Sequence, residues 1–432
     1  MVLDDGSQLG RQLPLPVEAR SEAPTVQGSG LPPSVSPKDE HSGTGHLMER
    51  VAAHANLEAA MKRVMAKKGS AGADGMPTTS LPDWYLERGD WLREQLLSGS
   101  FKPTAVRRVE IPKPDGGVRE LGIPTVVDRL VQQAVLLVLQ PLFDPTFSTH
   151  SYGFRPGRSA HDALRAAQQY VADDHTIVVD VDLEKFFDRV NHDVLMGRLA
   201  KRIEDKRLLG LIRGFLKAGI MLNGVVIERY EGTPQGGPLS PLLANFLLDE
   251  VDKELEARGH AFVRYADDCN VYVKSQRAGE RVMMSLKTLF GRLRLRINES
   301  KSGVAPVQQR VFLGVRIVWK GKEPRWGLAA KTKERFKNRI REITGRSRGR
   351  SLKYVVEELR KYLVGWRGYF RITATPSVLA DFDGWIRRRL RCLIIKQRRR
   401  HEHSWWALSR SANFTIPDRF FDDAGLPRLL EK

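Results

Sequence analysis

The sequence predicts an α+β fold that ends in a helical, strongly basic C-terminal part. A continuous β-branched run, TIVVDVD at residues 176–182, is typical of a buried strand. The pattern at residues 262–273 predicts two short strands on either side of an Asp-Asp turn. From Lys331 onward the spacing is helical, and residues 331–400 hold 22 Lys and Arg against six Asp and Glu. Strands and helices therefore share most of the chain, and helices dominate its last part.

The other elements follow in order along the chain. Residues 1–46 are rich in Ser, Gly and Pro and poor in aromatics, which predicts a disordered segment. The full length of 432 residues is enough for a sizeable core and about two to three domains. The expected elements are a helix over 47–68, a strand pair around a PDGG turn over 105–123, a helix over 130–142, a helix capped by Ser240 and a strand over 311–319.

The charge of the chain indicates a polyanionic partner. The net charge is +20, and the segment 331–400 alone carries +16. Aromatic residues are interleaved with these cations, and rings beside phosphate-neutralising groups suit RNA. An anionic membrane surface is the alternative, but no basic amphipathic anchor stands out, and the longest apolar run, residues 134–139, is far too short to span a bilayer. We therefore expect a nucleic-acid partner and no membrane.

Cysteine usage and the N-terminal residues bear on location. The two cysteines, Cys269 and Cys392, fit neither a disulfide framework nor a cysteine-rich zinc site. Residues 1–30 lack the basic start and apolar run of a signal peptide. We expect a reducing, cytoplasmic location.

The sequence YADD at residues 265–268 is the strongest local signal for chemistry. Asp267 and Asp268 lie side by side at the expected turn, and two adjacent carboxylates repel each other. A divalent cation relieves this repulsion, and oxygen ligands suit Mg²⁺. An ordinary Asp-Asp surface turn remains the alternative at this point.

Two further segments carry candidate site residues. Asp182 ends the 176–182 strand, with Asp180 on the same face but deeper. The loop TPQGGPLSP at residues 233–241 contains glycines that let backbone approach a ligand closely. The alternatives are a turn or helix-capping Asp and an ordinary strand-to-helix connection.

Taken in order, seven segments resemble a reverse transcriptase encoded by a group II intron, and the resemblance covers about residues 60 to 430. The segments are GADGM at 72–76, IPKPDGGVR at 111–119, YGFRPGRS at 152–159, DLEKFFD at 182–188, PQG at 234–236, YADD at 265–268 and FLG at 312–314. The resemblance implies a right-hand polymerase. Fingers and a palm with an antiparallel sheet would occupy residues 47–321, and a helical thumb and maturase domain would occupy residues 322–432.

The resemblance also implies which residues perform catalysis. Asp182, Asp267 and Asp268 would be the catalytic carboxylates and, with the backbone carbonyl of Leu183, would hold two Mg²⁺ ions. Asp182 is preferred to Asp180 because the family places an aromatic five positions after the metal-binding Asp, where this chain has Phe187.

The family likewise implies substrate contacts. Phe187 would exclude the 2′-hydroxyl of a ribonucleotide, although a core aromatic is the alternative. Leu313 and Gly314 resemble the primer grip, although a buried strand ending in glycine would explain them too. The other implied nucleotide-binding residues are Lys113, Arg119, Gln235 and Lys301.

The C-terminal motifs GWRGYF at 365–370 and WIRRRLR at 385–391 resemble the thumb and maturase region of intron proteins. They imply binding of group II intron RNA, besides dNTPs and a DNA target or primer. The residues expected to contact RNA phosphates are Arg387, Arg388, Arg389 and Arg391.

Two features depart from the family. The chain lacks the paired cysteines of the HNH endonuclease domain that many relatives carry, so it would need a primer from another source. Cys269 also stands where a larger apolar residue is expected. Two alternative functions stay open: an RNA-binding splicing factor with a vestigial polymerase, and a domesticated reverse transcriptase in defence. Activity on DNA would place the protein at the bacterial nucleoid, and the oligomeric state is not indicated.

Overall fold

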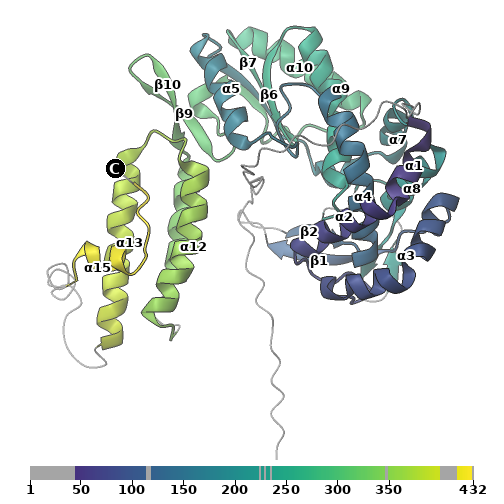
Figure 1. Cartoon of the computed structure of the whole chain (residues 1–432). Helices are drawn as coiled ribbons and strands as arrows, with labels where there is room; N and C mark the ends of the chain where they lie inside the picture. Colours follow the sequence, from purple (N-terminus) through teal and green to yellow (C-terminus); the bar gives the residue numbers. More distant parts are fainter. Residues whose placement is uncertain are drawn as a thin grey trace, which may run out of the picture. The chain divides into compact units, whose positions relative to one another are not determined.

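The computed structural model describes residues 44–112, 118–222, 225–227, 230–233, 236–345, 349–398 and 416–430 (Figure 1). The chain divides into two compact units. The first unit contains the described residues up to Ser159 together with Val179–Val271 and Glu280–Gly303. The second unit contains Ala160–Val178, Tyr272–Gly279 and the described residues from Val304 onward.

Runs of helices and runs of strands are mixed along the chain, as expected for an α+β fold, and the C-terminal part is helical. In chain order they are η1 (Thr44–His46), α1 (Leu47–Ala52), α2 (His54–Ala66), η2 (Thr78–Ser80), α3 (Leu81–Ser98), β1 (Val106–Pro112), β2 (Val118–Ile123), α4 (Val126–Phe143), η3 (Asp144–Thr146), α5 (Ala160–Ala172), β3 (Ile177–Val181), α6 (Phe186–Arg189), α7 (His192–Ala200), α8 (Lys206–Lys217), β4 (Ile220–Leu222), β5 (Val225–Ile227), α9 (Ser240–Ala257), β6 (Ala261–Tyr265), β7 (Asp268–Val273), α10 (Gln276–Arg292), β8 (Gly303–Pro306), η4 (Val307–Gln309), β9 (Val315–Lys320), β10 (Glu323–Leu328), α11 (Ala330–Ile343), α12 (Leu352–Phe370), α13 (Pro376–Arg398) and α15 (Asp418–Asp423).

Three sheets organise the strands. One four-stranded sheet has the order β2-β1-β4-β5, in which β1 pairs antiparallel with β2 and parallel with β4. A second four-stranded sheet has the order β6-β7-β3-β8 and contains the strands that flank the candidate catalytic residues. The third is the antiparallel hairpin of β9 and β10. The strand pair predicted over 105–123 and the strands predicted over 176–182 and 262–273 are confirmed.

Helix α4 is the core helix of the first unit. Its N-terminus is capped by Thr125, whose hydroxyl oxygen accepts a hydrogen bond from the Asp128 backbone N–H at 3.1 Å. Within the described residues, one helix is long and apolar enough to cross a membrane, and it is this one. Most of that stretch is buried inside the protein, where α4 packs against α1 and α2. Its apolar surface is therefore used for the core.

The second unit is held together by an aromatic and aliphatic core. Phe336 on α11 stacks on Phe382 of α13 with ring centroids 4.6 Å apart, and it also contacts Trp366 of α12 at 4.4 Å. Helix α5 packs on the β9–β10 hairpin, because the indole N–H of Trp326 donates to the Leu164 carbonyl oxygen at 3.1 Å. The helices predicted for the basic C-terminal part are confirmed, and their aromatics serve chiefly as core.

The predicted domain boundaries need two corrections. Residues 44–46 are not part of a disordered segment but form η1. The Asp205 backbone N–H donates a hydrogen bond to the Thr44 carbonyl oxygen at 3.2 Å and so fastens this turn to the rest of the first unit. The boundary between 321 and 322 would cut the β9–β10 hairpin at its turn, where Gly321 has a φ of +63°. Strand β10 lies inside the region predicted to be a helical domain, where no strand was expected. The second unit also contains earlier segments of the chain, such as α5.

Candidate active site

The candidate catalytic turn joins β6 to β7 and consists of Ala266 and Asp267. Ala266 has a φ of +58°, a left-handed conformation that a residue with a β-carbon rarely adopts. Gly153 lies directly against this turn, and a β-carbon at position 153 would stand 2.2 Å from the Ala266 backbone nitrogen. Glycine is therefore required there, and the loop around residue 153 supports the turn that carries Asp267 and Asp268.

A buried arginine fixes the conformation of the turn from inside the protein. Arg264, at the end of β6, is 1% exposed and donates to the Ala266 carbonyl oxygen at 2.8 Å. It also forms an ion pair with Asp252 of α9 and donates to the Asn245 side chain and the Ser151 hydroxyl oxygen. Burial alone would lower the pKa of Arg264, but the Asp252 carboxylate raises it above the ordinary value. The guanidinium thus stays charged and satisfies five acceptor oxygens.

Asn245 joins the same network to the supporting loop. Its side-chain amide donates to the Gly153 carbonyl oxygen at 3.1 Å while its oxygen accepts from Arg264 at 3.0 Å. In addition, the Tyr152 backbone N–H donates to the Arg264 carbonyl oxygen at 2.9 Å. We call Arg264, Asp252, Asn245 and Ser151 the turn clamp, because together they fasten the catalytic turn to the loop beneath it.

Asp182 is held by backbone contacts at the end of β3. Its N–H donates to the Ser302 hydroxyl oxygen at 2.9 Å, and its carbonyl oxygen accepts from the Asn298 N–H at 2.8 Å. The next residue, Leu183, is buried and forms an isolated antiparallel bridge with Ile297. The segment 296–302 therefore determines where the Asp182 carboxylate lies, beside the strand that begins with Asp268.

The carboxylates of the site are close enough to influence one another. Asp268 is exposed to solvent, yet desolvation by the surrounding protein, followed by repulsion from Asp267, Asp182 and Asp180, raises the pKa of its carboxyl group to about 7. Lys301 acts in the opposite direction, and its Nζ lies 3.4 Å from an Asp182 carboxylate oxygen. The site is thus a concentration of negative charge with one lysine beside it.

This donor set fits divalent cations. Mg²⁺ takes hard oxygen ligands. This site offers carboxylate oxygens that disfavour one another's ionisation, together with a backbone carbonyl oxygen after a strand. Within the described ranges, no three acidic, His or Cys side chains already converge as a complete ligand set. The fold therefore brings the groups together without closing a cage around an ion.

Phe187 lies on the short helix α6, five residues after Asp182, and is half-buried. Its backbone is fixed, since its carbonyl oxygen accepts from the Thr233 N–H at 2.7 Å, and its ring contacts Phe186 edge-on at 5.0 Å. The partly open ring is available on the same stretch of chain as the candidate metal ligand. The core-aromatic alternative fits Phe186, which is 2% exposed, better than Phe187.

The glycines of the loop after Thr233 serve close packing. Gly236 has a φ of +129°, and a β-carbon there would lie 2.8 Å from the Gly122 carbonyl oxygen at the end of β2. A β-carbon at Gly237 would lie 2.3 Å from the Gln132 side-chain oxygen of α4. The described part of the loop thus approaches neighbouring protein. Lys113 and Gln235 lie outside the described residues, as does the side chain of Arg119.

The predicted primer-grip residues form a tight turn rather than a strand. Leu313 and Gly314 have φ values of +50° and +82° between η4 and β9. The Tyr369 hydroxyl donates to the Leu313 carbonyl oxygen at 3.1 Å, and the Thr332 hydroxyl donates to the Gly314 carbonyl oxygen at 2.6 Å. The expected strand over 311–319 therefore begins only at Val315, and α11 and α12 hold the turn within the second unit.

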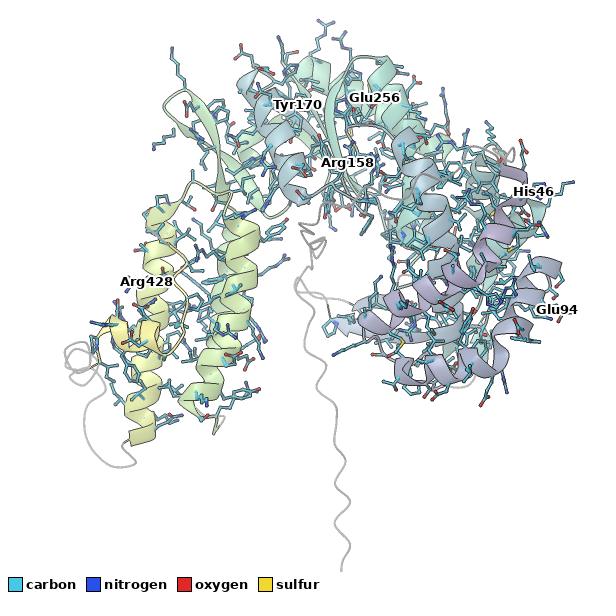
Figure 2. The ribbon with its side chains drawn as sticks, in the orientation of Figure 1. His46, Glu94, Arg158, Tyr170, Glu256 and Arg428 are labelled. Atoms are coloured by element: carbon cyan, nitrogen blue, oxygen red, sulfur yellow. The ribbon has the colours of Figure 1, made fainter. Side chains whose placement is uncertain are left out.

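Two of the four arginines predicted to contact RNA are structural. Arg387 is 1% exposed and forms ion pairs with Asp383 and Asp422, and Arg391 is buried against Asp418 at 2.5 Å. Sequence reasoning missed this because the acidic partners lie 27 or more residues later, on α15, or one helical turn earlier. Figure 2 labels Arg428, which forms a further ion pair with Asp422 at 2.5 Å. Arg387 and Arg391 join α13 to the C-terminal segment.

The other two arginines differ from these. Arg388 is exposed to solvent. Arg389 is half-buried, donates to the Thr344 hydroxyl oxygen at 2.7 Å and lies over the Trp385 ring at 5.4 Å. Of the four residues, Arg388 has the exposure that a phosphate contact requires.

Replacing Arg387 by alanine should lower the free energy of unfolding by about 3 kcal/mol, because it removes a buried guanidinium and leaves the half-buried carboxylates of Asp383 and Asp422 without their partner. Arg388→Ala is the matched control and should leave stability within about 0.5 kcal/mol of the wild-type value. Urea denaturation of the full chain measures both. An unchanged stability of the Arg387→Ala variant would contradict the structural role.

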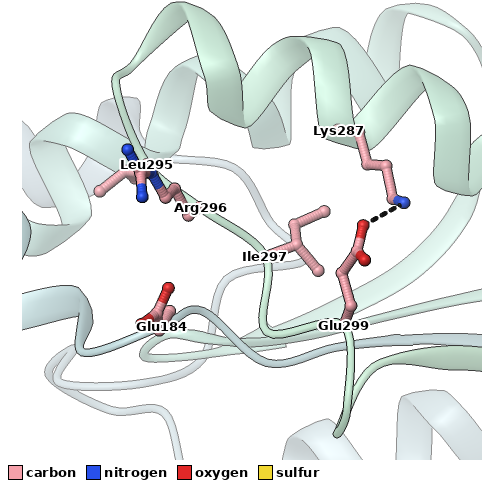
Figure 3. Close-up of a pocket in the computed structure, with 6 residues that line it drawn as sticks. All are labelled: Glu184, Lys287, Leu295, Arg296, Ile297 and Glu299. Carbon is pink, nitrogen blue, oxygen red and sulfur yellow. Dashed lines mark hydrogen bonds and ion pairs between the residues drawn. The ribbon is translucent and has the colours of Figure 1, made fainter.

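Figure 3 shows a shallow pocket whose lining includes Glu184, two residues after Asp182, and Arg296, in the segment 296–302. An ion pair between Lys287 and Glu299, at 2.7 Å, forms part of its wall. The Glu184 N–H also donates to the Arg296 carbonyl oxygen at 2.9 Å. The Glu184–Arg296 hydrogen bond therefore joins the chain just after Asp182 to the segment 296–302.

Comparison with known proteins agrees with the geometry. A family profile described as "Reverse transcriptase (RNA-dependent DNA polymerase)" matches residues 111–317. A second, described as "Group II intron, maturase-specific domain", matches residues 333–412. The first match includes both the end of β3 and the catalytic turn, and the second includes α11, α12 and α13.

Two relatives with known sequences point the same way. "Protein YkfC" of Escherichia coli (strain K12) is 35% identical over 61% of this chain and 80% of its own length. "Group II intron-encoded protein LtrA" of Lactococcus lactis subsp. cremoris is 37% identical over 45% of this chain, and the match spans about a third of its length (32%). A chain of the solved "Partial Cas6-RT-Cas1--Cas2 complex" shows 28% identity and a TM-score of 0.37 over 57% of this chain and 42% of that one. The chain belongs to the reverse transcriptases encoded by group II introns, with a maturase-specific domain after the polymerase region.

Proposed function

We propose that this chain copies intron RNA into DNA with two Mg²⁺ ions, and that it binds the same RNA to assist splicing. The observation that carries the proposal is the grouping of Asp182, Asp267 and Asp268 at neighbouring strands inside the reverse transcriptase region. The family generally uses divalent metal ions. The number of ions, their identity and the dNTP and DNA substrates are part of the proposal.

Each residue of the site has a proposed role. Asp182, Asp267 and Asp268, with the Leu183 carbonyl oxygen, would hold the ions. When bound, the ions would lower the pKa of the primer 3′-hydroxyl and neutralise the triphosphate. Lys301, whose Nζ is 3.4 Å from Asp182, places a positive charge where pyrophosphate would leave. Positioning and electrostatics of this kind supply most of the catalysis in phosphoryl-type transfers.

The fingers and the loop after Thr233 complete the proposed nucleotide site. Lys113 and Arg119 would contact the triphosphate and Gln235 the nucleotide, as the family resemblance implies. Arg119 lies on β2 and pairs with Ile111 across the β1–β2 hairpin, so its backbone belongs to the hairpin that would form the fingers. Leu313 and Gly314 would contact the primer from a turn that the second unit holds rigidly.

Phe187 is proposed to select deoxynucleotides. Replacing it by alanine would open space beside the sugar and should reduce the preference for dNTPs over NTPs by about ten-fold to 200-fold. The measurement is the ratio of kcat/KM for dGTP and GTP in single-nucleotide primer extension. Phe186→Leu is the control, since its buried ring should affect stability and leave the ratio unchanged. Equal discrimination by wild type and Phe187→Ala would remove Phe187 from this role.

The maturase function rests on the second unit. Its matched domain indicates binding of intron RNA, and the chain carries its excess of positive charge in the same region. Exposed cations of α11, such as Lys331 and Arg341, supply phosphate-binding charge that Arg387 and Arg391 do not. A DNA target, a primer from another source and a cytoplasmic location at the nucleoid complete the proposal. The maturase-specific domain disfavours the alternative of a domesticated defence enzyme.

Primer extension on an oligonucleotide-primed RNA template with dNTPs and Mg²⁺ tests the polymerase half. Template-length DNA is the expected product. Splicing of the host intron RNA at low Mg²⁺, with and without the protein, tests the maturase half. RNA binding and faster splicing without any DNA product would instead support the splicing factor with a vestigial polymerase.

A further inference from the structure

Phe154 combines two properties that a phenylalanine rarely shows together. Its backbone is left-handed, with a φ of +60°, and its side chain is 46% exposed to solvent. A single exposed apolar residue needs no explanation, but a bulky residue with positive φ is a genuine conformational outlier. Such backbone strain persists only where the surroundings enforce it, and it concentrates at functional sites.

The surroundings of Phe154 enforce its conformation from both sides. On one side, Gly153 packs against the Ala266 backbone of the catalytic turn, and Asn245 of the turn clamp donates to the Gly153 carbonyl oxygen. On the other side, Arg155 is 5% exposed and donates to the carbonyl oxygens of Ser148, Ser151 and Asp144 and to the Asp144 carboxylate. Because packing and hydrogen bonds fix both neighbours, the ring of Phe154 is held in its exposed position. The residue next to it, Gly153, contacts the catalytic turn directly.

The position of this ring determines what can contact it. Gly153 touches the residue before Asp267, so a substrate held by Asp267 lies within a short distance of residue 154. Arg158 follows in the same loop, where it lies over the Tyr152 ring at 5.4 Å (Figure 2). An outward aromatic ring with a cation nearby is the combination on which unpaired nucleobases stack.

We propose that Phe154 is a stacking platform for a nucleobase of the substrate held at the catalytic turn. This inference rests on the proposed polymerase function and extends it by naming a binding residue. The base can belong to the template strand, to the primer 3′ end or to the incoming nucleotide, which share the same aromatic face. The strained backbone is retained because it aims the ring at that base.

Three measurements distinguish the sources of the base. Fluorescence of 2-aminopurine, placed either at the templating position or at the primer 3′ end, reports stacking in the bound complex without requiring catalysis. The KM for the dNTP reports stacking on the incoming base. Loss of one stacking contact should weaken the affected step by about 5-fold to about 150-fold in Phe154→Ala.

The set of variants separates stacking from folding. Phe154→Trp keeps an aromatic face and should quench 2-aminopurine fluorescence as the wild type does. Phe154→Leu keeps apolar bulk without an aromatic face and should lose this quenching. Phe154→Gly removes the ring and accepts positive φ, so it should melt at a higher temperature than Phe154→Ala while losing the same stacking. Trp91→Ala, at an exposed aromatic (49%) on α3, is the control for general effects of aromatic removal.

The outcomes are distinguishable from a failure of the polymerase proposal. Lower 2-aminopurine fluorescence with wild type than with Phe154→Ala and Phe154→Leu, at one of the two positions, or a raised dNTP KM in those variants, supports the platform. The platform would be overturned if the wild type extends primers but Phe154→Ala and Phe154→Leu show the same fluorescence and the same dNTP KM as the wild type. A wild type that binds primed template but makes no DNA would overturn the polymerase proposal, and the fluorescence arm would still decide the role of Phe154.

Discussion

Replacing Asp267 by alanine should reduce the rate of DNA synthesis at least about a thousand-fold, because the site loses a carboxylate that, in the proposed function, would hold ions supplying several kcal/mol of transition-state stabilisation. Asp267 lies in the two-residue turn between β6 and β7, so its loss removes a ligand without disturbing a strand. Binding of intron RNA should persist, since the maturase-specific domain lies elsewhere in the chain. Single-turnover primer extension and a filter-binding assay measure the two quantities.

The control for this variant is Asp83→Ala, which removes an exposed carboxylate from the first turn of α3. Its rate of synthesis should equal that of the wild type. DNA synthesis by the Asp267→Ala variant at a rate within ten-fold of the wild type would show that the metal assignment is wrong. A joint loss of synthesis and RNA binding would instead indicate that the variant does not fold.

Arg264→Lys should lower kcat about a hundred-fold while leaving the KM for the dNTP unchanged. A lysine cannot form the bidentate pair with Asp252 and also reach the Ala266 carbonyl oxygen, so the catalytic turn would lose its internal support. A displacement of about 1 Å at reacting groups is enough for a loss of this size. Steady-state kinetics of single-nucleotide extension separate the two constants.

An ion pair to a second buried carboxylate of α9 supplies the matched control. Arg202 pairs with the buried carboxylate of Asp249 at 2.8 Å, one helical turn before Asp252, and has no contact with the catalytic turn among its described hydrogen bonds. Arg202→Lys should therefore reduce stability without changing kcat. If Arg264→Lys is too unstable to assay, Asn245→Ala keeps the Arg264–Asp252 pair and removes the link to Gly153. Equal kcat losses in the Arg202→Lys and Arg264→Lys variants would show that the turn clamp is merely structural.

Local sequence patterns were sufficient for β3, for β6 and β7, and for the turn between them. The β-branched run of β3 and the alternation around the YADD turn depend on neighbouring residues, and both elements form where the pattern places them. The position of Asp182 directly after a strand follows from the same local logic. The family resemblance then supplied the order of the motifs, which no single segment specifies.

Long-range partners were beyond the sequence alone. The WIRRRLR segment looks like a uniformly basic face, but Arg387 and Arg391 are neutralised by aspartates of α15 that no local pattern connects to them. The turn clamp was missed for the same reason, because Arg264 and its partners Asp252 and Ser151 lie on three separate elements. Gly321 has a positive φ at the β9–β10 turn. In the sequence only the glycine itself indicates this turn, and a single glycine is weak evidence without the paired strands.

Metal binding is the measurement that tests the central claim most directly. Electron paramagnetic resonance of Mn²⁺, titrated into the full chain with primed RNA template and a non-hydrolysable dNTP, counts bound ions without requiring turnover. We expect two ions per wild-type chain and none at this site in the Asp182→Ala/Asp267→Ala double variant. Equal numbers of tightly bound ions in the two proteins would contradict this expectation.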